Sequence, residues 1–185
     1  MSEREKMLAG GPYNARDPEL TAARDHARAT MARASAELDS AKRQEIYREL
    51  FGSMGEESFI EAPLFCDYGS NFYLGSDCFL NAHCVILDPG PVRLGDRVQC
   101  GPGVQLLTAD HPREASRRAA DEELSKPVTV GDDVWIGAGA IVCPGVTIGA
   151  ASIIGAGSVV TRDVPAGVLA AGNPCRVIRE LEDQA

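Results

Sequence analysis

The chain has 185 residues, enough for one domain with a buried core, and 44% of them are hydrophobic but only 5% aromatic, so we expect an aliphatic core. Its 27 acidic and 18 basic residues give a formal charge of -9, which argues against general attraction to nucleic acid or to an anionic membrane surface. The charged N-terminus lacks the apolar segment of a secretion signal, and no apolar run is long enough to span a bilayer. We therefore expect a cytoplasmic protein whose partners are small or neutral.

Residues 17–52 are predicted to be helical. Asp17, Pro18 and Glu19 make a typical helix start, with an N-cap, a proline at the first helical position and an acid in the first turn. Asp39 and Ser40 suggest a second cap, and Gly52 is the expected end of the helical segment. We expect residues 1–57 to form an N-terminal helical cap over one open end of the structure that follows.

A six-residue hydrophobic repeat fills most of the remaining chain. Neither a helix nor a flat strand has this period, so the repeat predicts an all-β solenoid whose coils stack around one continuous core. Small side chains recur four residues after the repeat position, which suits sharp corners and a triangular coil; Phe72 is an exception. The predicted core positions are Ala62, Tyr68, Leu74, Leu80, Ile86, Leu94, Cys100, Leu106, Val130, Ile136, Val142, Ile148, Ile154 and Val160.

The cysteines fit this pattern as packing residues. Cys66, Cys78 and Cys84 fall on the small position, and Cys100 falls on a core position. A free cysteine behaves as a small hydrophobic residue that is often buried. We therefore expect a structural role for these four and no nucleophilic cysteine.

The repeat leaves its six-residue step at two places. Between Ile86 and Leu94 the step is eight residues, which predicts a small bulge at a corner around residues 88–91. From Leu106 to Val130 it is 24 residues, and the phase returns afterwards. Residues 107–127 are polar and should form a loop that projects from a solenoid spanning residues 58–165, with residues 166–185 as a C-terminal tail.

The repeat does not stand alone, because several longer motifs accompany it in a fixed order. These are AGGPYNARDPEL, GSNFYLGSDCFLNAHCVILD, TADHP, KPVTVGDDVWIGAGAIVCPGVTIG and GAGSVVTRDVPAGVLAAGNPCRVIRE. Together they cover nearly the whole chain, and the chain resembles the galactoside and maltose O-acetyltransferases of the hexapeptide-repeat acyltransferase family. The resemblance implies a left-handed parallel β-helix with short N-terminal helices and one long protruding loop. It also implies a homotrimer that binds acetyl-CoA in the grooves between its subunits.

The same resemblance makes His111 the general base. Of the three histidines, His111 alone lies in the projecting loop, which in the family reaches across to the neighbouring subunit. An imidazole titrates near working pH and can accept the proton of a hydroxyl as that oxygen attacks a thioester. Pro112 restricts the backbone of His111 to extended conformations. The alternative is a solvated loop histidine.

Several polar residues match family positions that face the acceptor. His83 fits a plain wall position as well, and Asp17 is also a good N-cap. Glu123 would orient His111, with a solvated loop acid as the alternative. Asp110 stands where the sugar enzymes usually have threonine, which leaves the acceptor preference open. The acceptor candidates are Asn81, Ser70, Asp88, His83, Glu123, and either Asn14 or Asp17.

The cofactor candidates lie in the second half of the chain. By resemblance, the backbone N–H of Ala138 approaches the thioester carbonyl and stabilises the developing oxyanion. Ala156 contacts the pantetheine arm, and Thr161 and Arg162 follow where the coil ends. Arg176 and Arg179 match two arginines that bind the phosphates of coenzyme A, a task suited to the guanidinium group; solvated charges on a tail are the alternative.

These assignments predict an acetyl-CoA-dependent O-acetyltransferase that needs no metal and forms no covalent enzyme intermediate. The acceptor would be a hydroxyl of a sugar or a related small molecule; serine or an antibiotic is the alternative acceptor. A zinc hydratase resembling γ-class carbonic anhydrase would need three histidine ligands, whereas only His83 and His111 lie in the β-helical part. The last alternative is a non-catalytic β-helix protein that does not bind coenzyme A.

Overall fold

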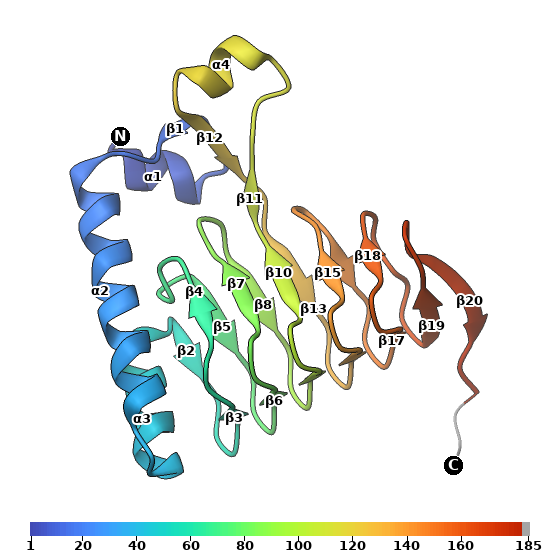
Figure 1. Ribbon diagram of the computed structural model, residues 1–185. Coiled ribbons are helices and arrows are strands. Elements are labelled where there is room, and N and C mark those ends of the chain that lie inside the picture. Colours follow the sequence, from blue (N-terminus) through green and yellow to red (C-terminus); the bar gives the residue numbers. More distant parts are fainter. Residues whose placement is uncertain (183–185) are drawn as a thin grey trace.

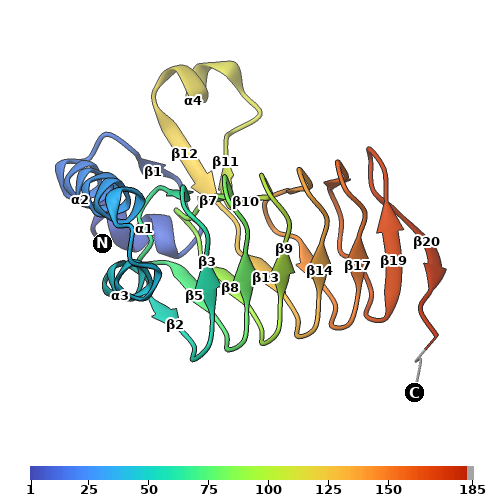
Figure 2. The same cartoon turned by 60° about the horizontal axis from the view of Figure 1, so that its bottom comes forward.

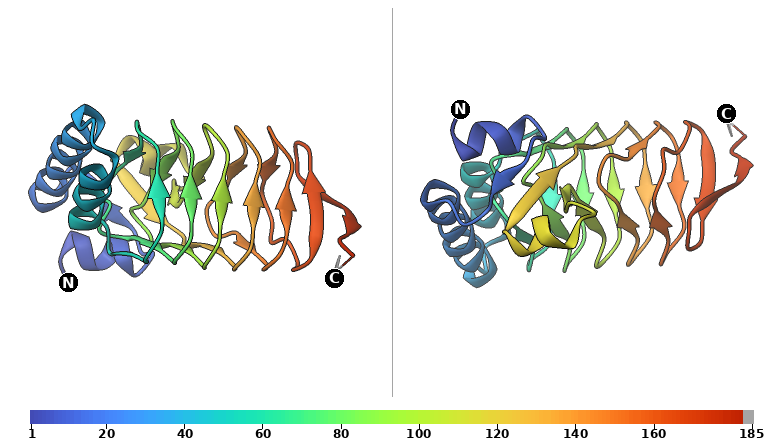
Figure 3. Two further views of the ribbon diagram at one scale, coloured as in Figure 1. Left: turned by 90° about the horizontal axis from the view of Figure 1, so that it is seen from below. Right: turned by 90° about the horizontal axis from the view of Figure 1, so that it is seen from above.

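The computed structural model describes residues 1–182 and confirms the predicted β-solenoid (Figure 1). In this part of the chain, three parallel sheets form the walls of a triangular coil, and we call them walls 1, 2 and 3. The N-terminal helices cover one end of the solenoid, and the C-terminal strand lies at the other end (Figure 3).

The N-terminal helices begin where the capping residues predict. Asp17 accepts a hydrogen bond from the Glu19 N–H at the start of α2, and Asp39 caps α3 in the same way. Helix α1 lies outside the predicted helical range; Ser2 and Glu5 form its capping box. The elements of this part are α1 (Glu3–Leu8), β1 (Tyr13–Asn14), α2 (Pro18–Ala36) and α3 (Ser40–Leu50).

The three walls take their strands in turn along the chain. Wall 1 contains β2 (Ser53–Met54), β5 (Phe72–Leu74), β8 (Val92–Leu94), β13 (Val128–Val130) and β16 (Thr147–Ile148). Wall 2 contains β3 (Phe59–Ile60), β6 (Phe79–Leu80), β9 (Gln99–Cys100), β14 (Trp135–Ile136), β17 (Ile153–Ile154), β19 (Val168–Ala171) and the antiparallel β20 (Arg176–Glu180). Wall 3 contains β4 (Phe65–Cys66), β7 (Val85–Leu87), β10 (Gln105–Leu107), β15 (Ile141–Val142) and β18 (Val159–Val160).

Both ends of the solenoid differ from the predicted boundaries. The first ladder begins at β2, before residue 58, because Met54 already pairs with Leu74. Beyond residue 165 the chain continues as β19 in wall 2 and returns as β20, so the expected tail is largely a strand pair.

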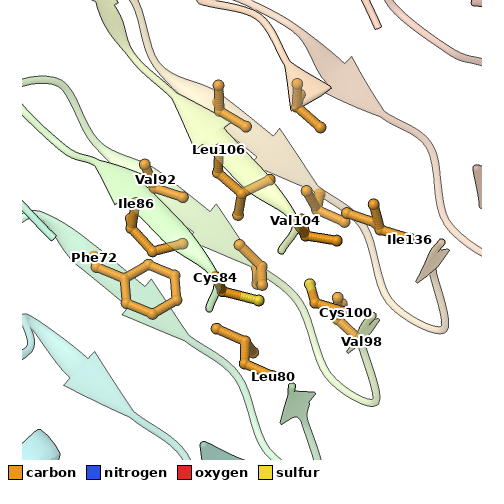
Figure 4. Close-up of a cluster of buried hydrophobic side chains, with 14 of the residues drawn as sticks. Phe72, Leu80, Cys84, Ile86, Val92, Val98, Cys100, Val104, Leu106 and Ile136 are labelled. Atoms are coloured by element: carbon orange, nitrogen blue, oxygen red, sulfur yellow. The ribbon is translucent and has the colours of Figure 1, made fainter. Parts of the chain in front are cut away.

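The core follows the predicted repeat from Leu74 onward. Leu80, Cys100 and Ile136 are Cα partners on adjacent strands of wall 2, and Figure 4 shows these side chains in the buried core. Cys78 and Cys84 fill the small positions, as predicted, with 2% and 1% of their surface exposed. The apolar side chains are therefore buried in stacked layers of the kind that close packing requires.

The predicted core positions in the first coil are wrong. Ala62 is half-exposed at a corner, and Tyr68 packs in a separate cluster with Met7 and the N-terminal segment. Cys66 pairs with Ile86 and occupies the core position instead of the small one. The reason is a second eight-residue step, between Cys66 and Leu74, which shifts the phase of the first coil.

All of the insertions lie at the same corner of the solenoid, where wall 3 passes into wall 1. The turns at residues 67–71 and 88–91 lie there in successive coils, and the long excursion occupies the same place in the next coil. The insertions therefore stack into one continuous surface beside α1 and α2 (Figure 2). This surface is where the chain can form a pocket.

The long excursion contains regular structure. Strand β11 (Ala109–Asp110) and strand β12 (Glu122–Ser125) form an antiparallel hairpin with α4 (Ala115–Ala119) near its tip. Strand β1 pairs with the other edge of β12, so that β12 lies between β1 and β11. The polar sequence of residues 107–127 predicted a loop, because a strand this short that pairs with the N-terminus has no local signal.

The outward faces of the walls differ in polarity. Two walls present apolar side chains to solvent, including Trp135 with 53% of its surface exposed and Phe65 with 41%. The outward row of wall 2 is Phe59, Phe79, Gln99, Trp135, Ile153 and Leu169. The row of wall 3 is Phe65, Val85, Gln105, Ile141 and Val159, whereas wall 1 presents Ser53, Tyr73, Arg93, Thr129 and Thr147.

Candidate active site

His111 follows directly after β11, where the hairpin strand ends and the chain continues toward α4, and its side chain is exposed. Its backbone N–H donates to Oδ1 of Asp110 at 2.8 Å, and Oδ2 of Asp110 accepts from Nζ of Lys126 at 2.9 Å. The hydrogen bond from Lys126 lowers the pKa of Asp110, so this carboxylate stays ionised. Asp110 therefore fixes the backbone that carries His111.

A polar cavity of about 280 Å³ opens beside His111. Its other lining residues are Ala15, Arg16, Arg118, Asp121, Glu122 and Glu123. The structure thus brings together His111 and Glu123, the residue predicted to orient it. Among the described residues, no hydrogen bond joins the two side chains. The N-terminal segment supplies one side of the cavity and the hairpin supplies the other.

A second cavity of about 280 Å³ adjoins the first and shares Ala15, Arg16 and Glu123 with it. Arg24 and Asp67 line this second cavity, and neither was predicted. The Arg24 guanidinium donates to the Tyr68 hydroxyl and to the Ala15 carbonyl oxygen, both at 2.6 Å, while burial raises the pKa of Asp67. Asp67 lies in the turn that the missed eight-residue step creates, so recognising that step would have revealed it.

Asp88 is fully buried and does not line either cavity. Its carboxylate accepts hydrogen bonds from the backbone N–H groups of Asp67, Tyr68 and Asn71, at 3.1, 2.9 and 3.3 Å. Burial raises its pKa to about 6, while the hydrogen bonds to Tyr68 and Asn71 act in the opposite direction. In this structure Asp88 holds the turn at residues 67–71, one coil away.

Three other acceptor candidates lie outside the His111 cavity. Ser70 is exposed and lines a separate cavity of about 270 Å³, which Tyr68 also lines. Asn14 lies on β1 opposite Glu122, where its side chain accepts from the Arg16 N–H. Asp17 caps α2. Each of the latter two has a local backbone partner, and this explains its presence without an acceptor.

Asn81 and His83 lie at a different corner, between wall 2 and wall 3. Asn81 Oδ1 accepts from the Ala82 N–H at 2.8 Å. His83 is exposed and has a left-handed backbone with φ 65°. The corresponding residues of the next two coils are Gly103 and Gly139, with φ 69° and 67°. Glycine is the residue least strained in this left-handed conformation, so a histidine at this corner is consistent with a functional role for its side chain.

The same corner carries an unpaired backbone donor. The Ala138 N–H has no acceptor among residues 1–182. In the two preceding coils the donor is unavailable, because Ala82 donates to Asn81 and Pro102 has no N–H. Ala156, one coil further on, again has no intramolecular acceptor in the described part. Ala138 and Ala156 therefore present N–H groups to whatever occupies this edge, as an oxyanion donor must.

The remaining cofactor candidates lie near the C-terminal end of the solenoid. Thr161 and Arg162 are exposed directly after β18, and Arg176 and Arg179 are exposed on β20. Arg176 pairs with Ala171, and Arg179 pairs with Leu169. Ala171 and Leu169 point outward from wall 2, so both arginines share the outward face with Trp135 and Ile153.

Two further findings concern residues 1–182. No helix in this range is long and apolar enough to cross a membrane. No three His, Cys, Asp or Glu side chains in it come together in a group that could hold a metal ion.

Comparison with known proteins agrees with this fold. Residues 6–55 match the maltose acetyltransferase hexapeptide capping motif, and residues 127–162 match the bacterial transferase hexapeptide with six repeats. The chain is 50% identical to Nodulation protein L of Rhizobium meliloti (strain 1021) over 178 residues, which are 95% of this chain and 97% of that protein.

Two solved structures are similar over almost the whole chain. The maltose O-acetyltransferase of Clostridium difficile 630 superposes with a TM-score of 0.97 at 44% identity, covering 99% of both chains. A hexapeptide-repeat acetyltransferase of Vibrio cholerae O1 biovar eltor, in complex with acetyl-CoA, has a TM-score of 0.91 at 41% identity, covering 99% of this chain and 100% of that one.

Proposed function

The chain belongs to the hexapeptide-repeat O-acetyltransferases with the maltose acetyltransferase capping motif, and we propose that it moves the acetyl group of acetyl-CoA to a hydroxyl of a sugar or a related small molecule. The observation that carries this proposal is the position of His111, the histidine of the 107–127 excursion, at a polar cavity it shares with Glu123. This cavity is large enough for a small polyol, and its lining offers both acidic and basic side chains as hydrogen-bond partners.

In the proposed reaction, Nε2 or Nδ1 of neutral His111 accepts the proton of the acceptor hydroxyl as its oxygen attacks the thioester carbonyl. The carbonyl oxygen becomes negative in the tetrahedral intermediate, and the Ala138 N–H, which lacks an intramolecular acceptor in the described chain, stabilises it. The C–S bond then breaks, and protonated His111 returns its proton to the coenzyme A thiolate. The acetyl group passes directly to the acceptor, and Glu123 orients His111.

For coenzyme A, we propose the edge that runs from Ala138 and Ala156 to the basic C-terminal end. The pantetheine arm would lie along the unpaired N–H groups, with Thr161 and Arg162 beyond them. Arg176 and Arg179 would bind the phosphates, because guanidinium groups bind phosphate oxygens with paired hydrogen bonds. The acetyl-CoA complex of the Vibrio relative supports acetyl-CoA as the co-substrate.

We propose a homotrimer with one site at each interface. Two walls expose apolar rows that a monomer would leave in water, whereas wall 1 is polar. In a closed ring, wall 2 of one subunit meets wall 3 of the next, which is a heterologous contact. The corner between walls 2 and 3 carries Asn81, His83 and Ala138, whereas His111 projects from the corner between walls 3 and 1. In the proposed trimer, a neighbouring subunit brings these two corners together. Sedimentation should give three times the 19.6 kDa chain mass.

We place the protein in the cytoplasm, with acetyl-CoA and a small acceptor as its partners and neither nucleic acid nor membrane among them. All six cysteines are unpaired thiols, which suits a reducing compartment. The formal charge of -9 disfavours polyanionic partners.

The test is an assay of thiol release from acetyl-CoA over a panel of sugars, amino sugars, serine and antibiotics. We expect release that depends on a hydroxyl acceptor and is highest with a sugar. Highest activity with serine or an antibiotic would contradict the acceptor class. A purified protein that does not bind acetyl-CoA would favour the non-catalytic β-helix protein. Stoichiometric zinc together with hydratase activity would favour the zinc hydratase.

A further inference from the structure

We infer that Tyr13 is a positioning residue of the acceptor pocket, which fixes the carboxylate of Glu123 next to His111. The N-terminal strand β1 is then part of the machinery for acetyl transfer and more than a cover for the solenoid. This inference rests on the proposed function, because it concerns the same cavity. Tyr13 acts on the reaction only through the side chain of Glu123.

The contact itself is specific. The Tyr13 hydroxyl donates to Oε2 of Glu123 at 2.8 Å, although the two residues are 110 positions apart in the chain. Only 3% of Tyr13 is exposed, and its ring packs with Met7, Leu20 and Tyr68. Burial, followed by the hydrogen bond to Glu123, raises the pKa of Tyr13. The phenol therefore stays protonated and remains a hydrogen-bond donor at any pH at which the protein works.

The backbone holds both partners in register. Tyr13 is the Cα partner of Glu123 across β1 and β12, and cross-strand partners point to the same face of a sheet. The other edge of β12 pairs with β11, after which His111 follows. Two further contacts fasten the N-terminal arm to the hairpin: Ser125 Oγ donates to the Met7 carbonyl oxygen at 2.6 Å, and Arg16 pairs with Asp121 at 2.9 Å.

Glu123 stands where its orientation matters. It is half-buried and lines both cavities, so its carboxylate lies at their junction. Tyr13 occupies Oε2, and Oε1 has no donor among the described residues. A carboxylate held by one oxygen offers the other in a defined direction, to an acceptor hydroxyl or to the imidazole N–H of His111. Without the phenol, the carboxylate can rotate between competing partners.

The experiment compares Tyr13→Phe, Glu123→Ala and the double variant with wild type. Phenylalanine keeps the buried ring and removes only the donor. We expect Tyr13→Phe to lower kcat/KM for the acceptor roughly tenfold while the KM for acetyl-CoA stays unchanged, since a hydrogen bond to a charged group is lost. In the Glu123→Ala background the same substitution should change kcat/KM less than about twofold, because nothing is left to position.

Glu3→Gln is the matched control, because Glu3 Oε2 accepts from the Asn14 N–H at 2.7 Å and so fastens the same strand without touching Glu123. It should retain wild-type kinetics. Three outcomes would each overturn the inference. The first is unchanged kinetics of Tyr13→Phe, and the second is an undiminished effect of Tyr13→Phe in the Glu123→Ala background. The third is an equal loss of kcat/KM toward both substrates together with a lowered melting temperature. If His111→Ala stays active, the proposed function fails; if only Tyr13→Phe behaves as wild type, this inference alone fails.

Discussion

Arg176 and Arg179 lie on the same face of β20, although they are three residues apart in the sequence. In a regular strand, residues with this spacing point to opposite faces. The pairing with β19 shifts register between Leu169 and Ala170, where β20 has an extra residue, and this bulge returns Arg179 to the face of Arg176. Both guanidinium groups therefore point outward, next to the predicted coenzyme A edge.

This geometry predicts that the two arginines act on the cofactor alone. Arg176→Gln and Arg179→Gln should each raise the KM for acetyl-CoA about tenfold, because a charge-assisted hydrogen bond to phosphate is lost, and should leave the acceptor KM unchanged. Steady-state kinetics with each substrate varied in turn measures this. Arg33→Gln, which breaks an exposed pair with Glu49, is the control and should match wild type.

The unpaired N–H of Ala138 can be removed with proline. Pro102 occupies the same place in the preceding coil, so this corner accepts proline at that position. We expect Ala138→Pro to lower kcat by about 10² to 10³ while isothermal titration finds coenzyme A affinity largely retained, since the lost donor acts mainly on the oxyanion. Pro102→Ala is the control. Normal kcat in a folded Ala138→Pro protein would exclude the oxyanion role.

Asp88 predicts a pH dependence of stability. Its pKa is raised from 3.8 to about 6 in the folded protein, so the folded state holds the proton more tightly than the unfolded state does. The stability linked to this proton is complete below pH 3.8 and is lost as the pH rises through about 6. The loss is at most about 3 kcal/mol.

Urea unfolding of wild type and Asp88→Asn across this range measures the effect. The difference in unfolding free energy, wild type minus variant, should fall between pH 4 and pH 6 and stay level above it. Asp88→Asn should also raise the acceptor KM, because Asp88 holds the turn that carries Asp67, and Asp67 lines the cavity that adjoins the His111 cavity. A difference that does not change with pH would contradict the assignment.

The periodicity of the sequence was sufficient to predict the solenoid, because each repeat position is buried by its neighbours in the next coil. It failed in the first coil, where Ala62 and Tyr68 continue the six-residue spacing by coincidence and Cys66 holds the core position. The pairing of Cys66 with Ile86 in the structure reveals the phase shift at that place.

The candidate site was predictable only in part. His111 was identifiable because it interrupts a strict repeat, and Ala138 because its surrounding motif resembles the family. Tyr13 and Arg24 carried no local signal: each reaches the cavity through a contact with a distant residue, Glu123 in one case and Tyr68 in the other. Asp88 was assigned to the acceptor because it matches a polar family position that faces the acceptor, and the structure buries it under three backbone donors.

The central claim is that His111 is the base for direct acetyl transfer, and the His111→Ala variant tests it most directly. Its kcat/KM for the best acceptor should fall by about 10² to 10⁴, while the Kd for coenzyme A, measured by isothermal titration, stays within about twofold of wild type. His26→Ala, a histidine on α2, should behave as wild type. A folded His111→Ala protein that binds coenzyme A and keeps more than about a tenth of wild-type activity would contradict the account.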